Sequence, residues 1–303
     1  MDKQLLNNFF EQLALKDTFQ KKYIANWEEK YQGSELEDFC QLLSFYIDVE
    51  HKTMDEIIDG YMFINNMVKE EQYFFVTNGR YRYSKFSEVE GAVYGNAEYM
   101  SRYMLGLTIS DYVWIQHMKM VRFFESKFLP QAGGEYLEIG PGYGQYTKRA
   151  LKSGKFQKVL ACDLSAESVR GCKAFLQYQE DLNGKETSWD ILHMGFNDFE
   201  ENRYFDTIVM GEVLEHVENP LQILSSIKKH LSENGRAFIT TVINAPMLDH
   251  IYLFSTIKEV KQLVYDAGLD IEDYVTFAAG DMAIEKAEAK KRTIDIALIV
   301  KSK

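Results

Sequence analysis

One segment, residues 136–144, constrains the fold of this chain more than any other. It is a short apolar run with Glu138 near its end, followed directly by a glycine-rich turn. Gly140, Gly142 and Gly144 stand two residues apart, where a side chain would block the approach of a ligand or force an unfavourable φ. A helix starting directly after the turn would point its free N–H groups and positive dipole end at whatever occupies it. The segment therefore predicts a strand, a ligand-binding turn and a helix in succession.

Two kinds of ligand use such a turn, and the spacing separates them. A dinucleotide-binding turn follows the pattern G-x-G-x-x-G and places a pyrophosphate over the helix start. In this chain Gln145 stands where the third glycine would be, and Glu138 precedes the first. A carboxylate there would repel a pyrophosphate, but it suits a cationic ligand that carries an amino group. The turn by itself would also fit an ordinary tight strand-to-helix connection, so the interpretation depends on further segments.

Beyond the Pro- and Gly-containing linker at 130–134, strand-like and helix-like runs alternate. Such alternation predicts a parallel, doubly wound sheet with helices between the strands. Two further β-prone runs, separated by a charged segment, end the chain. The expected strands are residues 135–139, 158–163, 189–193, 205–210, 236–243, 271–277 and 293–300.

Polar residues follow the second and third expected strands. Asp163 ends a buried strand pattern, where a carboxylate can accept both hydroxyls of a ribose. It could instead cap the next helix, although Ser165 is suited to that role as well. After the third strand, Gly195, Phe196 and Asn197 form a turn, and Asp198 is either a ligand carboxylate or a helix cap.

A fourth segment, residues 205–220, contains the run Glu-Val-Leu-Glu-His-Val from Glu212 onward. With the three segments before it, in the same order, it resembles the class I S-adenosylmethionine-dependent methyltransferases. The resemblance covers residues 135 to about 245 and implies S-adenosylmethionine as the cofactor. It places Glu138 and the glycine turn at the amino-acid end of the cofactor and Asp163 at its ribose. It also implies that Phe196 and Asn197 lie at the adenine, and Met210 and Glu212 beside the methionine part.

The resemblance implies a two-domain α/β protein. Residues 131–303 would form a Rossmann-like, seven-stranded, doubly wound sheet whose last strand is antiparallel. Residues 1–130 would form a mainly helical, winged-helix-like domain, because a β-prone run at 73–77, the turn Asn78–Gly79 and a returning run at 80–83 follow several helices. Small-molecule O-methyltransferases carry a similar domain, which caps the substrate and forms a homodimer, so we expect a homodimer here.

Two histidines are candidates for the chemistry. His216 follows the fourth strand, and His250 lies in the loop after the fifth. An acceptor alcohol or phenol needs deprotonation, and an ordinary imidazole is suited to that at neutral pH. In the winged-helix O-methyltransferases a comparable histidine is the base, but here Val217-Glu218-Asn219-Pro220 departs from their signature. His216 could instead serve only packing or cofactor contacts. His250, with Asp249, could bind the acceptor or just cap a helix that begins near Ser255. We predict no metal site.

The composition of the chain limits the kinds of partner that we expect it to bind. The net charge of −12 would repel nucleic acid, and no apolar run is long enough for a membrane span. Three irregularly spaced cysteines and a charged N-terminus without a signal-peptide core predict a reducing, cytoplasmic location. We therefore expect methylation of oxygen, nitrogen or carbon on a small molecule, in specialised metabolism. The alternatives are a non-catalytic, metabolite-sensing regulator with a winged helix, and a methyltransferase that acts on a protein.

Overall fold

The computed structural model describes residues 2–16, 18–94, 96–184, 187–200 and 202–303, and the chain divides into two compact units. One unit comprises residues 1–66 and 101–118, and the other comprises residues 67–100 and 119–303. This division differs from the expected boundary at residue 130, because residues 67–100 and 119–130 group with the sheet. The domains 1–130 and 131–303 stay a prediction about which parts fold independently.

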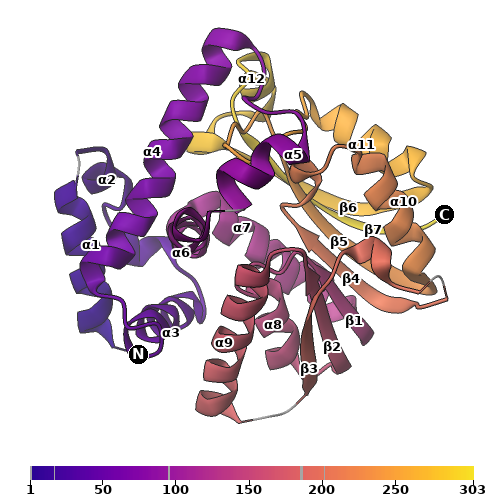
Figure 1. Cartoon of the computed structure of the whole chain (residues 1–303), viewed down its shortest axis with the longest axis horizontal. Helices are drawn as coiled ribbons and strands as arrows, with labels where there is room; N and C mark the ends of the chain where they lie inside the picture. The colour runs from indigo at the N-terminus through magenta and orange to yellow at the C-terminus, as the bar shows by residue number, and fades with distance from the viewer. Residues whose placement is uncertain (1, 17, 95, 185–186, 201) are drawn as a thin grey trace. The chain divides into compact units, whose positions relative to one another are not determined.

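The larger unit is built on one seven-stranded sheet in the order β3-β2-β1-β4-β5-β7-β6 (Figure 1). The first five strands pair in parallel, whereas β7 runs antiparallel to both β5 and β6. This confirms the predicted fold class, including the antiparallel last strand. The strands are β1 (Gly134–Ile139), β2 (Phe156–Asp163), β3 (Ser188–His193), β4 (Phe205–Gly211), β5 (Leu231–Ile243), β6 (Leu269–Ala278) and β7 (Ile294–Ser302).

Helices cover both faces of the sheet, because each central strand is apolar on both sides. One face packs against α10, α11 and α12, and the buried side chains there include Phe205, Leu224 and Val260. The other face buries aromatic rings from α8 and from the segment before β1 around Phe238. The helices of this unit that follow β1 are α8 (Gln145–Ser153), α9 (Ala166–Asn183), α10 (Pro220–His230), α11 (Ile257–Asp266) and α12 (Ile284–Ala289).

The strand order fixes where a ligand can bind. The chain winds outward from β1 through β2 to β3, then returns to place β4 on the other side of β1. Loops leaving the carboxyl ends of β1 and β4 therefore diverge to opposite faces, and ligands of open α/β sheets bind in the resulting crevice. Short turns shape this edge and the loops around it: η5 (Phe196–Asp198), η6 (Leu214–His216) and η7 (Ala279–Asp281).

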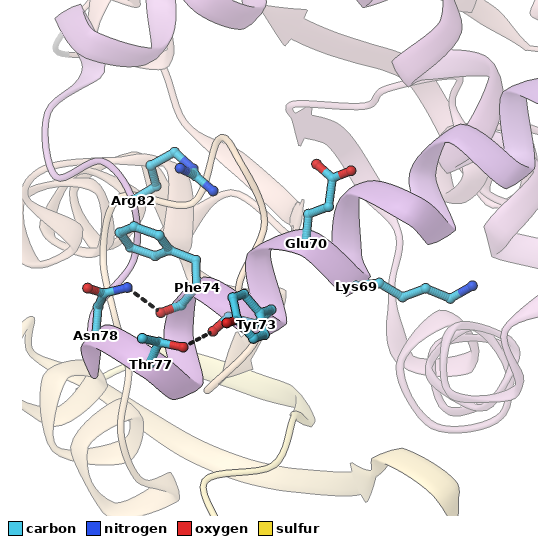
Figure 2. A pocket seen from close by; sticks show the side chains of 7 residues that line it. All are labelled: Lys69, Glu70, Tyr73, Phe74, Thr77, Asn78 and Arg82. Carbon is cyan, nitrogen blue, oxygen red and sulfur yellow. Dashed lines mark hydrogen bonds between the residues drawn. The ribbon is translucent and has the colours of Figure 1, made fainter.

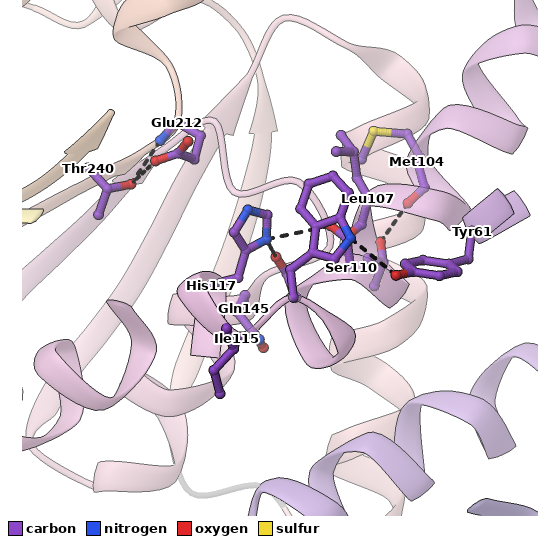
Figure 3. Close-up of polar contacts among 12 residues, drawn as sticks. Tyr61, Met104, Leu107, Ser110, Ile115, His117, Gln145, Glu212 and Thr240 are labelled. Carbon is purple, nitrogen blue, oxygen red and sulfur yellow. Dashed lines mark hydrogen bonds and ion pairs between the residues drawn. The ribbon is translucent and has the colours of Figure 1, made fainter. Parts of the chain in front are cut away.

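The smaller unit is helical, with a core rich in aromatic rings. Phe39 lies at its centre, edge-on to Phe9 and stacked on Tyr112. His117 contacts Ser110 and pairs with Asp111, so it is a partnered histidine and not an exposed base (Figure 3). The helices that contribute wholly or in part are α1 (Lys3–Lys16), α2 (Thr18–Tyr23), η1 (Trp27–Lys30), α3 (Glu35–Asp48), α4 (Met54–Asn78), α6 (Ala97–Val113) and α7 (Ile115–Phe123).

The prediction of a β-hairpin at residues 73–83 is wrong. Helix α4 continues without a break through the β-prone run to Asn78. Burial of Phe75 against Tyr81 outweighs the β propensity of its neighbours, which is a weak preference. Gly79, at φ 69°, ends the helix by donating its N–H to the Phe75 carbonyl, so the Asn-Gly pair is a helix C-terminus. In the part of the chain that the structure describes, no strand precedes β1, so the β-hairpin that a winged helix requires is not formed there.

The remaining short elements lie between α4 and β1 in the chain, before and after α6 and α7. They are α5 (Phe86–Val89), the π-helices η2 (Glu90–Tyr94) and η3 (Phe124–Phe128), and η4 (Leu129–Gln131). Among the described residues, no helix combines the length and the apolar character needed to cross a bilayer.

Candidate functional site

The glycine turn after β1 has the conformation that its sequence requires. Gly140, Gly142 and Gly144 have φ values of 65°, 55° and 82°, in the region that side chains disfavour. A Cβ on Gly140 would lie 2.7 Å from Val213 Cγ2, so the turn also packs closely against the loop after β4. The Gly140 N–H donates to Cys162 on β2, and the Gly144 N–H donates to Pro141. A ligand at the start of α8 could therefore approach the backbone of this turn closely, because no side chain stands at its three glycines.

Glu138 lies beneath this turn and is 1% exposed. Its Oε2 accepts hydrogen bonds from the hydroxyls of Tyr136 and Thr147, which come from β1 and α8. These bonds tie the strand to the first turn of the helix and hold the loop between them. A direct contact of Glu138 with a ligand stays a prediction, since in this structure the carboxylate supports the turn.

Asp163 ends β2 beside the turn, as predicted. Its Oδ1 accepts the Ser165 N–H at 2.8 Å, while Ser165 itself caps α9 by accepting the Ser168 N–H. Ser165 therefore takes the capping role that was the alternative for Asp163. Burial raises the pKa of Asp163 to about 6, although the N–H groups of Ser165 and Gly142 and the nearby His193 act in the opposite direction. A carboxylate in this position gains from any ligand that donates hydrogen bonds to it.

The side chains after β3 point differently from the prediction. Phe196 is 5% exposed and packs edge-on against His230 of α10, so it belongs to the core. The Asn197 side chain accepts a hydrogen bond from Ser226, also on α10. Asp198 accepts the Gly195 N–H at 2.9 Å, which is the capping role left open for it. Phe196 and Asn197 thus both contact α10, the first by apolar burial and the second by a hydrogen bond. Their contact with adenine stays a prediction.

An apolar surface that the sequence reasoning missed lies between β2 and β3. Leu164, directly after Asp163, is 68% exposed, which is unusual for a large apolar side chain beside a buried strand end. A Cβ on Gly195 would lie 3.4 Å from its Cδ2, and Met194 is half-buried next to it. The sequence feature that could have indicated this surface is Leu164 itself, a leucine directly after the end of a strand.

The loop after β4 has a strained backbone. Met210 is fully buried in the core, so its backbone and not its side chain reaches the edge of the sheet. Glu212 has φ 53°, an uncommon conformation for a residue other than glycine. Thr240 of β5 holds it there, because the Glu212 N–H contacts both oxygens of Thr240 and the Thr240 hydroxyl donates to Glu212 Oε1 at 2.7 Å (Figure 3). This backbone conformation of Glu212 changes the direction of the chain between β4 and η6.

Three residues gather where η6 meets the loop after β5. One ligand atom each of Glu215, His216 and His250 lies within 4.8 Å of the others. The two imidazole rings meet edge to face at 4.8 Å between centroids. The backbone brings them together, since Ile251 and Tyr252 both donate their N–H groups to the Glu215 carbonyl. Both predicted histidines are therefore in one cluster, and Glu215 is a member that the prediction omitted.

The two histidines of this cluster differ in burial and in the charged groups around them. Burial, and repulsion from His216, lower the pKa of His250 to about 3, so its imidazole is neutral at pH 7 and a weak base. His216 keeps a partly exposed side chain and lies 3.4 Å from Asp249 Oδ2. Burial, with repulsion from Glu212, raises the pKa of Glu215 well above its usual range. Of the two histidines, His216 fits a general base better.

The segment that was expected to form the wing covers this cluster instead. The Tyr81 hydroxyl accepts the Ala245 N–H at 3.0 Å, and its ring centre lies 6.0 Å from that of His250. The Phe86 N–H donates to the Glu218 carboxylate at 2.9 Å. Burial raises the pKa of Tyr81 above its ordinary value, so the hydroxyl stays neutral. Tyr81 thus positions the loop that carries His250, a role that its sequence context did not signal.

A separate surface pocket of about 560 Å³ lies along the C-terminal half of α4 (Figure 2). Thr77 and Asn78 in its wall donate hydrogen bonds to carbonyls of their own helix. Arg82 stacks over Phe74 at 4.4 Å and pairs with Glu71. The residues that line the pocket do not include those of the turn after β1 or the loop after β4, and Thr77, Asn78 and Arg82 are engaged with their neighbours.

Part of this chain is similar in sequence to known proteins. Residues 137–237 match the family model of a methyltransferase domain. The ubiquinone biosynthesis O-methyltransferase of Dictyostelium discoideum is 27% identical over 128 residues, which cover 41% of this chain and 39% of that protein. The enzyme of the same name from Candida albicans is 31% identical over 142 residues, covering 46% of this chain and 41% of that protein. The chain thus matches less than half the length of these curated relatives.

Among solved structures, mitomycin 7-O-methyltransferase MmcR aligns with 78% of this chain and 68% of its own, with a TM-score of 0.51 and 13% identity. At that identity the likeness concerns the fold alone. The sequence resemblance, the family match and the strand order agree on a class I methyltransferase fold.

Proposed function

Since residues 137–237 form a methyltransferase domain of the class I, S-adenosylmethionine-dependent type, we propose that this chain is an enzyme that methylates a small molecule. One observation carries the proposal. The bare glycine turn after β1 and the loop after β4 that leads to His216 lie against each other, since a Cβ on Gly140 would be 2.7 Å from Val213 Cγ2. A ligand bound at the turn would therefore present its reactive end to the cluster.

The residues at the turn fit S-adenosylmethionine. The three glycines leave no side chain over the start of α8, where the positive end of the helix dipole favours a carboxylate. Asp163 is a half-buried carboxylate at the end of β2, and its oxygens can accept the hydroxyls of a ribose. Leu164 offers an exposed apolar side chain on the same side, which suits adenine. These assignments, and the contact of Glu138 with the amino group, belong to the proposal.

When bound, S-adenosylmethionine supplies an electrophilic methyl group on a positively charged sulfur. The acceptor atom forms a bond to the methyl carbon while the carbon–sulfur bond breaks and its electron pair stays on sulfur. The chain's part is to hold the acceptor in line with that bond. For a hydroxyl acceptor it must also take up the proton, which the partly exposed His216 is placed to accept, with Asp249 beside its Nδ1.

Several observations favour a small acceptor. The net charge of −12 disfavours nucleic acid, and residues 80–90 cover the loop that carries His250. The curated relatives named above carry the name of enzymes of ubiquinone biosynthesis, which favours an oxygen nucleophile. The alternative of a winged-helix regulator has less support than the sequence suggested, because α4 occupies the place of the expected hairpin. Specialised metabolism, a homodimer and a cytoplasmic location stay predictions.

We expect the purified protein to transfer radiolabelled methyl from S-adenosylmethionine to members of a panel of phenols, catechols and small amines. Extraction into organic solvent separates labelled small molecules from labelled protein. Label in the organic phase that depends on one acceptor class supports the proposal. Label found only in added protein would instead support the protein-acceptor alternative, and none in either fraction from a folded, cofactor-binding protein would support the regulator.

A further inference from the structure

A buried tyrosine hydroxyl on β1 donates to the residue that the proposed function places beside the amino group of the cofactor. Tyr136 is fully buried, and its ring packs edge-on against Phe156 at 5.0 Å between centroids. Its hydroxyl donates to Glu138 Oε2 at 3.0 Å. A phenylalanine would fill the same space without burying a hydroxyl, which is costly unless that group is hydrogen-bonded. We propose that the hydroxyls of Tyr136 and Thr147 hold the Glu138 carboxylate in position for the amino group of S-adenosylmethionine.

This positioning role rests on the proposed function, and the geometry of the strand supports it. Side chains two residues apart lie on one face of a strand, so Tyr136 and Glu138 both face α8. Thr147 is the third residue of α8 and donates to the same oxygen, Glu138 Oε2. One donor thus precedes the glycine turn in the chain, and the other follows it. Two donors on one oxygen restrict the rotation of the carboxyl group, so its orientation relative to the turn is fixed.

The two hydroxyls also favour the ionised form of Glu138. The side chain is almost completely buried, and burial by itself disfavours a charge. Hydrogen bonds donated to the charged form act in the opposite direction. Burial, with the negative charge of Glu138, raises the pKa of Tyr136 well above its ordinary value, so this hydroxyl stays protonated and can donate. An ionised carboxylate beneath the turn attracts the positively charged amino group of the cofactor and repels an anion.

The proposed role predicts an effect on one part of the ligand only. Asp163, which the proposed function places at the ribose, ends the neighbouring strand β2, and Leu164 follows it. Loss of the Tyr136 hydroxyl changes the surroundings of Glu138 and should leave those two side chains in place. Binding of the amino-acid part should therefore weaken, while binding of the nucleoside part is retained. A tyrosine that only supported the fold would affect both parts alike.

The test compares three ligands that differ in the amino-acid part. S-adenosylhomocysteine carries both the amino group and the carboxylate, its decarboxylated analogue keeps the amino group alone, and methylthioadenosine lacks both. Each ligand is titrated by calorimetry into the wild type, Tyr136→Phe and Thr147→Val, and saturation-transfer NMR measures binding in the millimolar range. We expect each variant to bind the two amino-containing ligands about tenfold more weakly, the scale of one hydrogen bond to a charged group, and methylthioadenosine within about twofold of the wild type.

Two further variants serve as controls. Thr147→Ser keeps the hydroxyl that Thr147→Val removes, so it should recover most of the lost affinity. Tyr61→Phe removes another buried tyrosine hydroxyl, one that accepts the Trp114 indole N–H at 3.2 Å in the smaller unit. This variant should lose stability in thermal unfolding but bind all three ligands as the wild type does. Methylthioadenosine binding shows that the nucleoside part of the site is still folded in each variant.

An equal loss for all three ligands, or no loss for S-adenosylhomocysteine, overturns the positioning role. A loss for S-adenosylhomocysteine that spares its decarboxylated analogue overturns it as well, because the hydroxyls would then serve the carboxylate end of the ligand. A wild type that binds none of the three ligands contradicts the proposed function itself. A wild type that binds them, with no selective loss in the variants, contradicts only the role of Tyr136 and Thr147.

Discussion

Replacing Gly140 by alanine is expected to weaken S-adenosylmethionine binding at least about 100-fold. The backbone at φ 65° costs a residue with a side chain about 1–2 kcal/mol, and the new Cβ would press on Val213 at 2.7 Å. The turn would have to move, with loss of backbone hydrogen bonds to a charged ligand of about 1.5–3 kcal/mol each. Two such bonds correspond to an affinity change of that size. Calorimetric titration with the cofactor measures it.

Gly154→Ala is the matched control for this variant. Gly154 ends α8 at φ 64°, almost the same backbone conformation, but a Cβ there meets nothing within 4 Å. Both variants should lose stability in thermal unfolding, because both place alanine in a left-handed conformation. Only Gly140→Ala should lose cofactor affinity. Equal affinity in the two variants would show that the turn after β1 is not the binding surface.

Replacing His216 by asparagine is expected to lower turnover about 10²–10⁴-fold, the range of general acid–base catalysis, while cofactor affinity stays within about threefold. His216 has its Nδ1 held by the Asp249 carbonyl, and in the proposed function it is the base on the acceptor side. Asparagine is smaller and keeps an amide donor, so the loop should stay folded. Single-turnover rates on an acceptor that the wild type methylates measure the effect.

His51→Asn controls for the loss of a histidine as such. His51 is exposed and has φ 54°, a conformation that asparagine adopts readily, so its variant should match the wild type. Full turnover by His216→Asn would contradict a catalytic role for the cluster. A parallel loss of cofactor binding in His216→Asn would place the residue at the cofactor instead.

The sheet and half of the site could be predicted because they depend on local patterns. Apolar runs that end in Glu138 and Asp163 mark strands whose carboxyl ends meet at one edge, and the glycine spacing fixes a turn that no other residue type adopts as easily. The parallel order then brings Asp163 to the turn without further information. Such features need only the period of a strand and the conformational range of glycine.

The rest depends on contacts between distant segments. Residues 73–77 have strand propensity but are helical, because Phe75 is buried against Tyr81 across the helix end. Phe196 follows the right strand, yet burial against α10 turns it away from the crevice. Glu215 joins His250 only because two N–H groups of the later loop donate to its carbonyl. Spacing along the chain does not reveal that closure, although the Glu212 and Glu215 pair beside His216 was a visible hint.

The most direct test of the account is a calorimetric titration with S-adenosylmethionine of the wild type and Asp163→Asn, at pH 7.5 and pH 5.0. The ionised Asp163 accepts the ribose hydroxyls, and its pKa in the free protein is about 6, so affinity falls as the pH drops through that value. We predict micromolar binding to the wild type at pH 7.5 and about tenfold weaker binding at pH 5.0, one unit below the pKa. Asp163→Asn should bind about 10–100-fold more weakly at pH 7.5 and lose the pH dependence.

The control variant is Asp190→Asn, whose exposed side chain lies on β3, and it should bind the cofactor as the wild type does. A folded wild type that does not bind the cofactor, or an Asp163→Asn variant that binds equally well, would contradict the central claim.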